Sequence, residues 1–150
     1  MDKQEIIDNA LSRFDEGYAC SQSVLLAFSD EFNLDERTAK LISANFGGGM
    51  GRLREKCGAL TGGFMVLGLK YGNTDPTDLD TKLASYKKVR ILNKQVTAIY
   101  ESTNCADILK KHATKDEVID RKHHQIICRE IVGNVTGMVY DLLQYENTIQ

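Results

Sequence analysis

Four cysteines, the residues of this chain best suited to bind a soft metal or exchange electrons, are spread along its length at Cys20, Cys57, Cys105 and Cys128. Successive cysteines are separated by 37, 48 and 23 positions, so the chain has no Cys-x-x-Cys pair. That spacing argues against an ordinary structural zinc site, a thioredoxin-type dithiol and haem attachment through Cys-x-x-Cys-His. Four thiolates from distant segments would suit an iron–sulfur cluster. Two reversible thiol pairs are equally allowed, and nothing chooses among the three pairings.

Three of these cysteines, Cys20, Cys57 and Cys105, fall where the sequence predicts the start of a helix. Free backbone amides and the helix dipole stabilise a thiolate there. Basic side chains flank two of the four sites, and they would lower the thiol pKa further if they face the sulfurs. These side chains are Arg52, Arg54 and Lys56 before Cys57, and Arg121, Lys122, His123, His124 and Arg129 around Cys128. The competing interpretation, that a cysteine merely fills apolar space, is equally open for any one of them but weakens for all four.

A glycine-rich segment lies just upstream of Cys57, with four glycines among residues 47–51. Such a density of glycine prevents a stable helix. Backbone amides of Gly47, Gly48 and Gly49, together with Gly58, could bind an anion or the edge of a cofactor. The segment lacks the Gly-Lys-Ser/Thr ending of a P-loop and follows no predicted strand, so nucleotide binding is unsupported. A tight packing turn is the competing interpretation.

The three histidines and the acidic residues offer weaker signals. His112, His123 and His124 could be ligands or proton carriers, but His123 and His124 lie among charged residues and are expected to be solvated. Pairs of Asp and Glu show no catalytic spacing. Whether the protein is an enzyme is therefore left open.

The elements that must position the cysteines are predicted to be helices throughout. Apolar residues recur at intervals of three and four, and Pro occurs once. We expect helices that span residues 3–14, 57–69 and 78–100. Further helices should start near residue 20, after the N-cap residues Asp35 and Asn104, and at the capping box at 114–117, and the last helix should carry Cys128. The almost wholly apolar segment 57–69 should be a central helix packed on several sides. The expected fold is a compact all-α single domain over 1–150, a bundle of about six to seven helices with a glycine-rich central loop.

Length and charge narrow the class of protein. The chain has 150 residues, a net charge of −2 and well-mixed signs, so we expect one domain, no nucleic-acid partner and no attraction to a membrane. The sequence has neither a membrane-spanning run nor the layout of a signal peptide, and we expect a cytoplasmic protein. A reducing cytosol disfavours structural disulfides and shifts four cysteines towards metal binding or redox chemistry.

Several motifs together resemble a known family. They are Gly17-Tyr18-Ala19-Cys20-Ser21-Gln22, the glycines at 47–49, Cys57-Gly58-Ala59-Leu60-Thr61-Gly62, Asn104-Cys105 and Cys128. In their order and their glycine-rich centre they resemble the C_GCAxxG_C_C family, which is described as redox-active, from about Gly17 to the last helix. The resemblance implies that the four cysteines act together. One departure is that Cys57 precedes Gly58 and Ala59, whereas the family name writes Gly-Cys-Ala.

The sequence thus favours a small redox protein that exchanges electrons with a partner oxidoreductase. Cys20, Cys57, Cys105 and Cys128 would be iron–sulfur cluster ligands or redox thiols, with no cofactor in the second case. A non-catalytic protein that binds zinc through the same cysteines is the alternative, and a helical interaction module with inert buried cysteines is a third. The sequence also allows a homo-oligomer.

Overall fold

The computed structural model describes residues 2–111 and 121–149, and in this part of the chain helices joined by loops are the regular secondary structure. The helices are α1 (Lys3–Asp15), α2 (Cys20–Ser29), α3 (Glu36–Ser43), α4 (Gly47–Met50), α5 (Gly58–Tyr71), α6 (Leu79–Tyr100), α7 (Cys105–Lys111) and α8 (Arg121–Ile149). Short 3-10 turns, η1 (Asp30–Phe32) and η2 (Ala44–Phe46), flank α3. The all-α prediction is confirmed.

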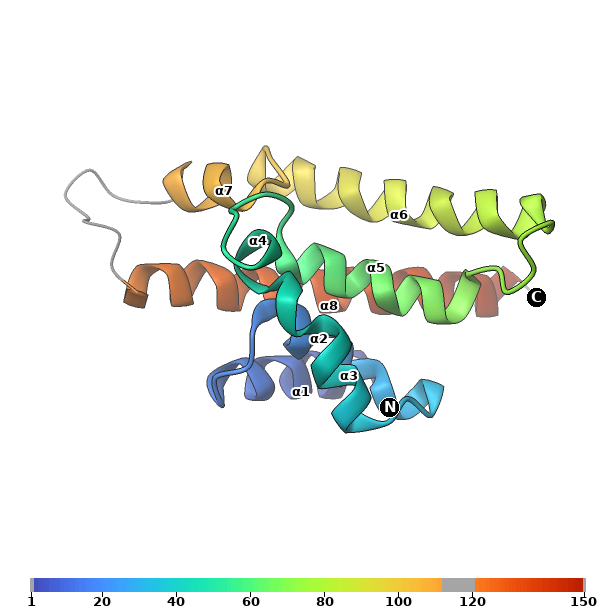
Figure 1. The fold of residues 1–150 in the computed structure, drawn as a ribbon, viewed down its shortest axis with the longest axis horizontal. Coiled ribbons are helices and arrows are strands. Elements are labelled where there is room, and N and C mark those ends of the chain that lie inside the picture. The colour runs from blue at the N-terminus through green and yellow to red at the C-terminus, as the bar shows by residue number, and fades with distance from the viewer. Residues whose placement is uncertain (1, 112–120, 150) are drawn as a thin grey trace.

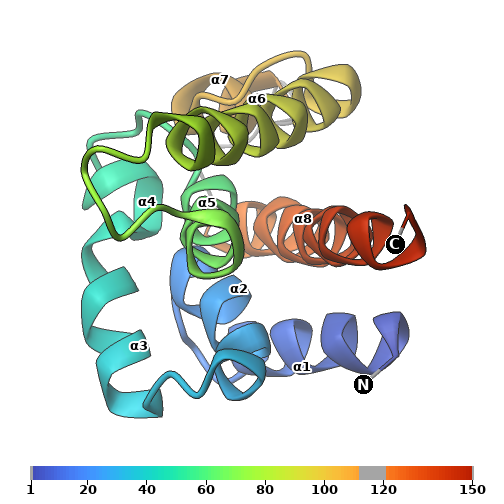
Figure 2. The same cartoon turned by 90° about the vertical axis from the view of Figure 1, so that its right-hand side faces the viewer.

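The helices form layers, with α5 at the centre (Figures 1 and 2). In Figure 2, α6 and α7 lie above α5 and α8, α1 and α2 lie below them, and α3 and α4 close one flank. Helix α5 packs against α2, α6 and α8, as its apolar sequence predicts. Its mainly apolar surface carries no polar stripe, which suits a helix that is covered on several sides.

Close packing of α2 on α5 depends on a small residue. A Cβ atom built on Gly62 would lie 2.7 Å from the carbonyl oxygen of Ser21, so no larger side chain fits between the two helices. Large side chains then fill the core around this contact; fully buried ones include Leu25, Phe28, Leu60, Leu67, Leu92, Val132 and Val135. This contact brings the first residue of α2 beside the start of α5.

Local capping signals place the helix starts where the sequence predicts them. Asp35 accepts a hydrogen bond from the Thr38 amide at 2.9 Å, and Asn104 accepts one from the Asp107 amide at 3.2 Å. The capping box predicted at 114–117 lies outside the described residues, as does His112. In the described part of the chain, no helix is long and apolar enough to cross a membrane.

Candidate four-cysteine site

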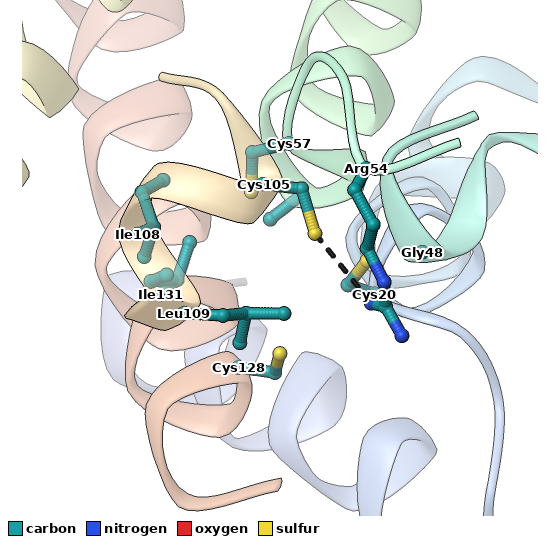
Figure 3. Close-up of a pocket in the computed structure, with 11 residues that line it drawn as sticks. Cys20, Gly48, Arg54, Cys57, Cys105, Ile108, Leu109, Cys128 and Ile131 are labelled. Carbon is teal, nitrogen blue, oxygen red and sulfur yellow. Dashed lines mark hydrogen bonds between the residues drawn. The ribbon is translucent and has the colours of Figure 1, made fainter. Parts of the chain in front are cut away.

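All four cysteines line one small cavity of about 40 Å³ (Figure 3). Cys20 is the first residue of α2, Cys57 is the N-cap of α5, Cys105 is the first residue of α7, and Cys128 lies within α8. All are free thiols. Cys57 and Cys105 are buried, whereas Cys20 and Cys128 are partly exposed. Residues far apart in the chain therefore present their sulfurs to a common space.

Backbone pairing holds the starts of α5 and α7 together. The Cys57 amide donates to the carbonyl of Thr103 at 2.8 Å, and the Cys105 amide donates to the carbonyl of Glu55. Lys56 and Asn104 form an isolated antiparallel bridge at the same place. Each cysteine is thus held by the strand-like segment that precedes the other, and this pairing fixes the two sulfur-bearing residues side by side.

A glycine at the start of α5 lets the third sulfur approach. A Cβ atom on Gly58 would lie 2.5 Å from the Cys20 sulfur and 2.7 Å from the carbonyl oxygen of Phe46, both shorter than van der Waals contact. The Cys20 side chain consequently packs directly on the backbone of α5. The absence of a side chain at Gly58 thus makes room for the Cys20 sulfur, and Gly58 also lines the cavity.

The predicted glycine loop is a left-handed turn. Residues 48–52 all have positive φ, at 70°, 67°, 70°, 58° and 67°, and Arg54 has φ of 60°. Although α4 spans this loop, Gly48 and Gly49 are not helical inside it, as the glycine density predicts. Met50, Arg52 and Arg54 are not glycines, and each costs on the order of 1–3 kcal/mol in this conformation. Such strain persists because surrounding contacts hold the turn.

The turn aims two groups at the sulfurs. The Gly48 amide donates to the Cys20 sulfur, and Nη1 of Arg54 lies 3.7 Å from the Cys105 sulfur (dashed line in Figure 3). A Cβ atom on Gly49 would lie 2.6 Å from the Cβ of Cys105, so Gly49 permits this approach without lining the cavity. Of the glycines predicted to border a cofactor, Gly48 and Gly58 line the cavity; Gly47 and Gly49 are absent from its described lining.

Backbone amides at the helix starts point at the sulfurs of Cys20 and Cys57, but the lowering of the thiol pKa predicted for these two cysteines is wrong. The lowering expected at Cys128 from flanking basic side chains is also outweighed. Cys57 accepts hydrogen bonds from the amides of Ala59 and Leu60, which favour its thiolate. Burial nevertheless raises the pKa of Cys20, and it raises those of Cys57 and Cys128 to about 12. Negative charge on neighbouring sulfurs raises them further. Desolvation therefore outweighs the amides in the metal-free protein.

The basic side chains flanking the cysteines divide into those that face the site and those that do not. Arg54 faces it, and its charge lowers the pKa of Cys128 slightly against the larger effect of burial. Lys56 instead donates to Asn93 and Thr103, at 3.0 and 2.8 Å. Arg129 pairs with Asp15 at 2.8 Å. The side chains of residues 121–123 lie outside those that the structure describes.

Apolar side chains that the sequence analysis did not assign to the site complete the wall. They are Ala59 of α5, Ile108 and Leu109 of α7, and Ile131 of α8. Their positions carry a usable signal, because each follows a cysteine by two to four residues and so lies within about one helical turn of it. Together they shield the sulfurs from water on the inner side.

The four sulfurs are soft potential metal ligands, but they are not arranged as a closed metal-binding group. Among the side chains that the structure describes, those of residues 2–111 and 124–144, no three from His, Cys, Asp or Glu are grouped closely enough to hold a metal ion. The sulfurs instead surround the cavity as neighbouring thiols. Such an arrangement can oxidise in pairs, or can ligate a thiophilic metal if the sulfurs move closer together.

A family model described as "Putative redox-active protein (C_GCAxxG_C_C)" matches residues 18–142 of the chain. The match spans all four cysteines and the glycine-rich turn. No curated protein and no solved structure matches the chain.

Proposed function

The chain belongs to the C_GCAxxG_C_C family, and we propose that it is a small redox protein whose four cysteines together hold an iron–sulfur cluster. The observation that carries this proposal is that sulfurs from four separate helices line one cavity. The protein would accept an electron from a reduced partner oxidoreductase and pass it to an oxidised one, in the cytoplasm, where thiols are kept reduced.

The chemistry of the site supports cluster ligation. Iron–sulfur clusters are held by cysteine thiolates, and their potentials depend on hydrogen bonds to sulfur and on exposure to solvent. In this chain, amides of Gly48 and Ser21 donate to Cys20, while amides of Ala59 and Leu60 donate to Cys57. When bound, the cluster would supply one-electron chemistry. Cys20, Cys57, Cys105 and Cys128 would hold it, while Ile108, Leu109 and Ile131 would exclude water.

The test is reconstitution of anaerobically purified protein with iron and sulfide. We expect bound iron and sulfide, visible absorption that bleaches on reduction, and loss of all three signals in each single Cys→Ser variant. Ala106→Ser is the matched control, because it places the same hydroxyl on the exposed side of α7, next to Cys105. A protein that retains no iron after desalting contradicts the cluster proposal, as does a Cys→Ser variant that binds as much iron as the control.

A second candidate is a reversible thiol/disulfide centre. It is favoured by the absence, among the described residues, of three ligands grouped as a bound metal requires. In this reaction two protein thiols lose two protons and two electrons, and an S–S bond forms between them. A partner protein takes up the two protons and two electrons, and its own disulfide is thereby reduced to two thiols. Thiol counting distinguishes it: oxidation should reduce four titratable thiols to two or none, reversibly and without metal. Zinc in the purified protein, with an unchanging thiol count, would favour the alternative of zinc binding.

A further inference from the structure

A wider groove opens beside the sulfur cavity and shares part of its wall. Its volume is about 580 Å³, within the range of small-molecule sites. Four residues, Cys20, Gly48, Arg54 and Cys128, line both the groove and the inner cavity. In Figure 3 the Arg54 side chain extends past the Cys105 sulfur towards Cys20. A molecule in the groove would therefore meet the two partly exposed thiols first, before it reached Cys57 and Cys105.

The groove is lined by groups that attract negative charge. Arg52 and Arg54 contribute two guanidinium groups, and His124 also lines the groove. Side-chain amides of Gln22, Asn45 and Gln125 add neutral hydrogen-bond donors. The described lining contains no Asp or Glu, although the chain as a whole is acidic. The local charge of this surface is thus opposite in sign to that of the protein.

The strained turn holds the two arginines in place, and no carboxylate among the described residues forms an ion pair with either of them. Both have positive φ, at 67° for Arg52 and 60° for Arg54, so the left-handed turn sets where their side chains leave the backbone. Positive charges that line a concave surface raise the local concentration of anions.

We propose that this groove admits a small anionic ligand, with a carboxylate or oxyanion group, to Cys20 and Cys128. Arg52 and Arg54 would bind the charged oxygens, and the remainder of the ligand would lie against the two thiols. This role rests on the proposed function in so far as the ligand would be a substrate of the redox centre. The attraction of an anion to these two sulfurs depends on the groove alone.

The test compares two alkylating reagents of similar size but different charge, anionic iodoacetate and neutral iodoacetamide, on reduced, iron-free protein. In both reactions the thiolate sulfur displaces iodide, so an S–C bond forms and a C–I bond breaks, while the thiol proton goes to water. The ratio of the two rates cancels the thiol pKa. At low ionic strength, we expect this ratio at Cys20 and Cys128 to exceed that of N-acetylcysteine amide by about tenfold.

Variants assign the effect to the groove. Arg52→Gln and Arg54→Gln should each lower the rate ratio towards that of the free thiol, while Arg90→Gln, which removes the same charge from the exposed face of α6, should leave it unchanged. If Arg54→Gln fails to fold by circular dichroism, Arg52→Gln alone decides. Sulfate and acetate should both slow alkylation, and the stronger competitor identifies the oxyanion or the carboxylate as the preferred group.

The proposal is overturned if the rate ratio equals that of the free thiol, if it is insensitive to the groove arginines, or if neither reagent reaches Cys20 and Cys128 in folded protein. None of these results depends on iron or on disulfide formation. A failure of the groove is therefore distinguishable from a failure of the redox centre.

Discussion

A single methyl group at Gly58 should disrupt the sulfur site, because this glycine lies where α5 meets Cys20. The Cβ atom of Gly58→Ala would lie 2.5 Å from the Cys20 sulfur, 2.7 Å from the Phe46 carbonyl oxygen and 3.4 Å from the Gly47 Cα. The sulfur can rotate away, but the carbonyl is backbone and must shift. Overpacking of this kind costs about 1–3 kcal/mol.

The same substitution ten residues later is the matched control. Gly68 lies in α5 on its exposed side, and a Cβ atom there would meet nothing within 4 Å. Replacing glycine by alanine inside a helix stabilises by about 0.5–1 kcal/mol. Gly68→Ala should therefore raise the free energy of unfolding, whereas Gly58→Ala should lower it.

Urea denaturation of the reduced, metal-free proteins measures both effects. In thermal unfolding of a chain of this length, each kcal/mol of unfolding free energy corresponds to a shift of roughly 2–4 °C in Tm. Gly58→Ala should also displace the Cys20 sulfur and so change its alkylation rate in the folded protein. If Gly58→Ala is as stable as Gly68→Ala and Cys20 reacts at the wild-type rate, the packing of Cys20 against α5 is refuted.

Three further perturbations test the surroundings of the site. Ile108→Ala, which removes a side chain that is 1% exposed from the cavity wall, should cost about 2–5 kcal/mol in urea denaturation; a cost below 1 kcal/mol would mean that this wall is not packed. Ser21→Ala should cost about 1–2 kcal/mol, because the buried hydroxyl donates to the Ser43 carbonyl at 2.7 Å, and a neutral effect would contradict that bond. The reduced, metal-free protein should lose stability between about pH 9 and pH 12, where unfolded thiols ionise but Cys57 and Cys128 stay protonated. The urea midpoint should fall by up to the equivalent of about 1.4 kcal/mol per pH unit for each of these thiols, and a flat profile would show that they are not buried as neutral groups.

The helix starts that carry cysteines could be predicted because their signals are local. Asn104 is a strong N-cap residue and precedes Cys105, and the apolar, glycine-containing sequence after Cys57 suits a central helix. Periodicity of three and four likewise placed Cys128 on a helix. These features depend on neighbours within one or two turns, which a sequence displays directly.

The electrostatics of the site could not be predicted in the same way. The positions of the helix starts predicted the hydrogen bonds from backbone amides to Cys20 and Cys57 correctly, but they predicted the wrong direction for the pKa of these two thiols. The pKa is raised by burial, which depends on packing against residues of α7 and α8. The left-handed turn also extends over Met50, Arg52 and Arg54, residues with no local preference for positive φ. Its pairing with the start of α7, through the amides of Cys105 and Ala106, is a contact across some fifty residues that no local signal reveals.

The most direct test of a shared four-cysteine centre is a count of protected thiols. Iron- and sulfide-loaded protein, alkylated while folded and mapped by mass spectrometry, should show Cys20, Cys57, Cys105 and Cys128 protected together, and chelation of the iron should expose the partly exposed pair to reagent while unfolding releases all four. Protection of only some of the four, or protection that does not change when iron is removed, would contradict the account.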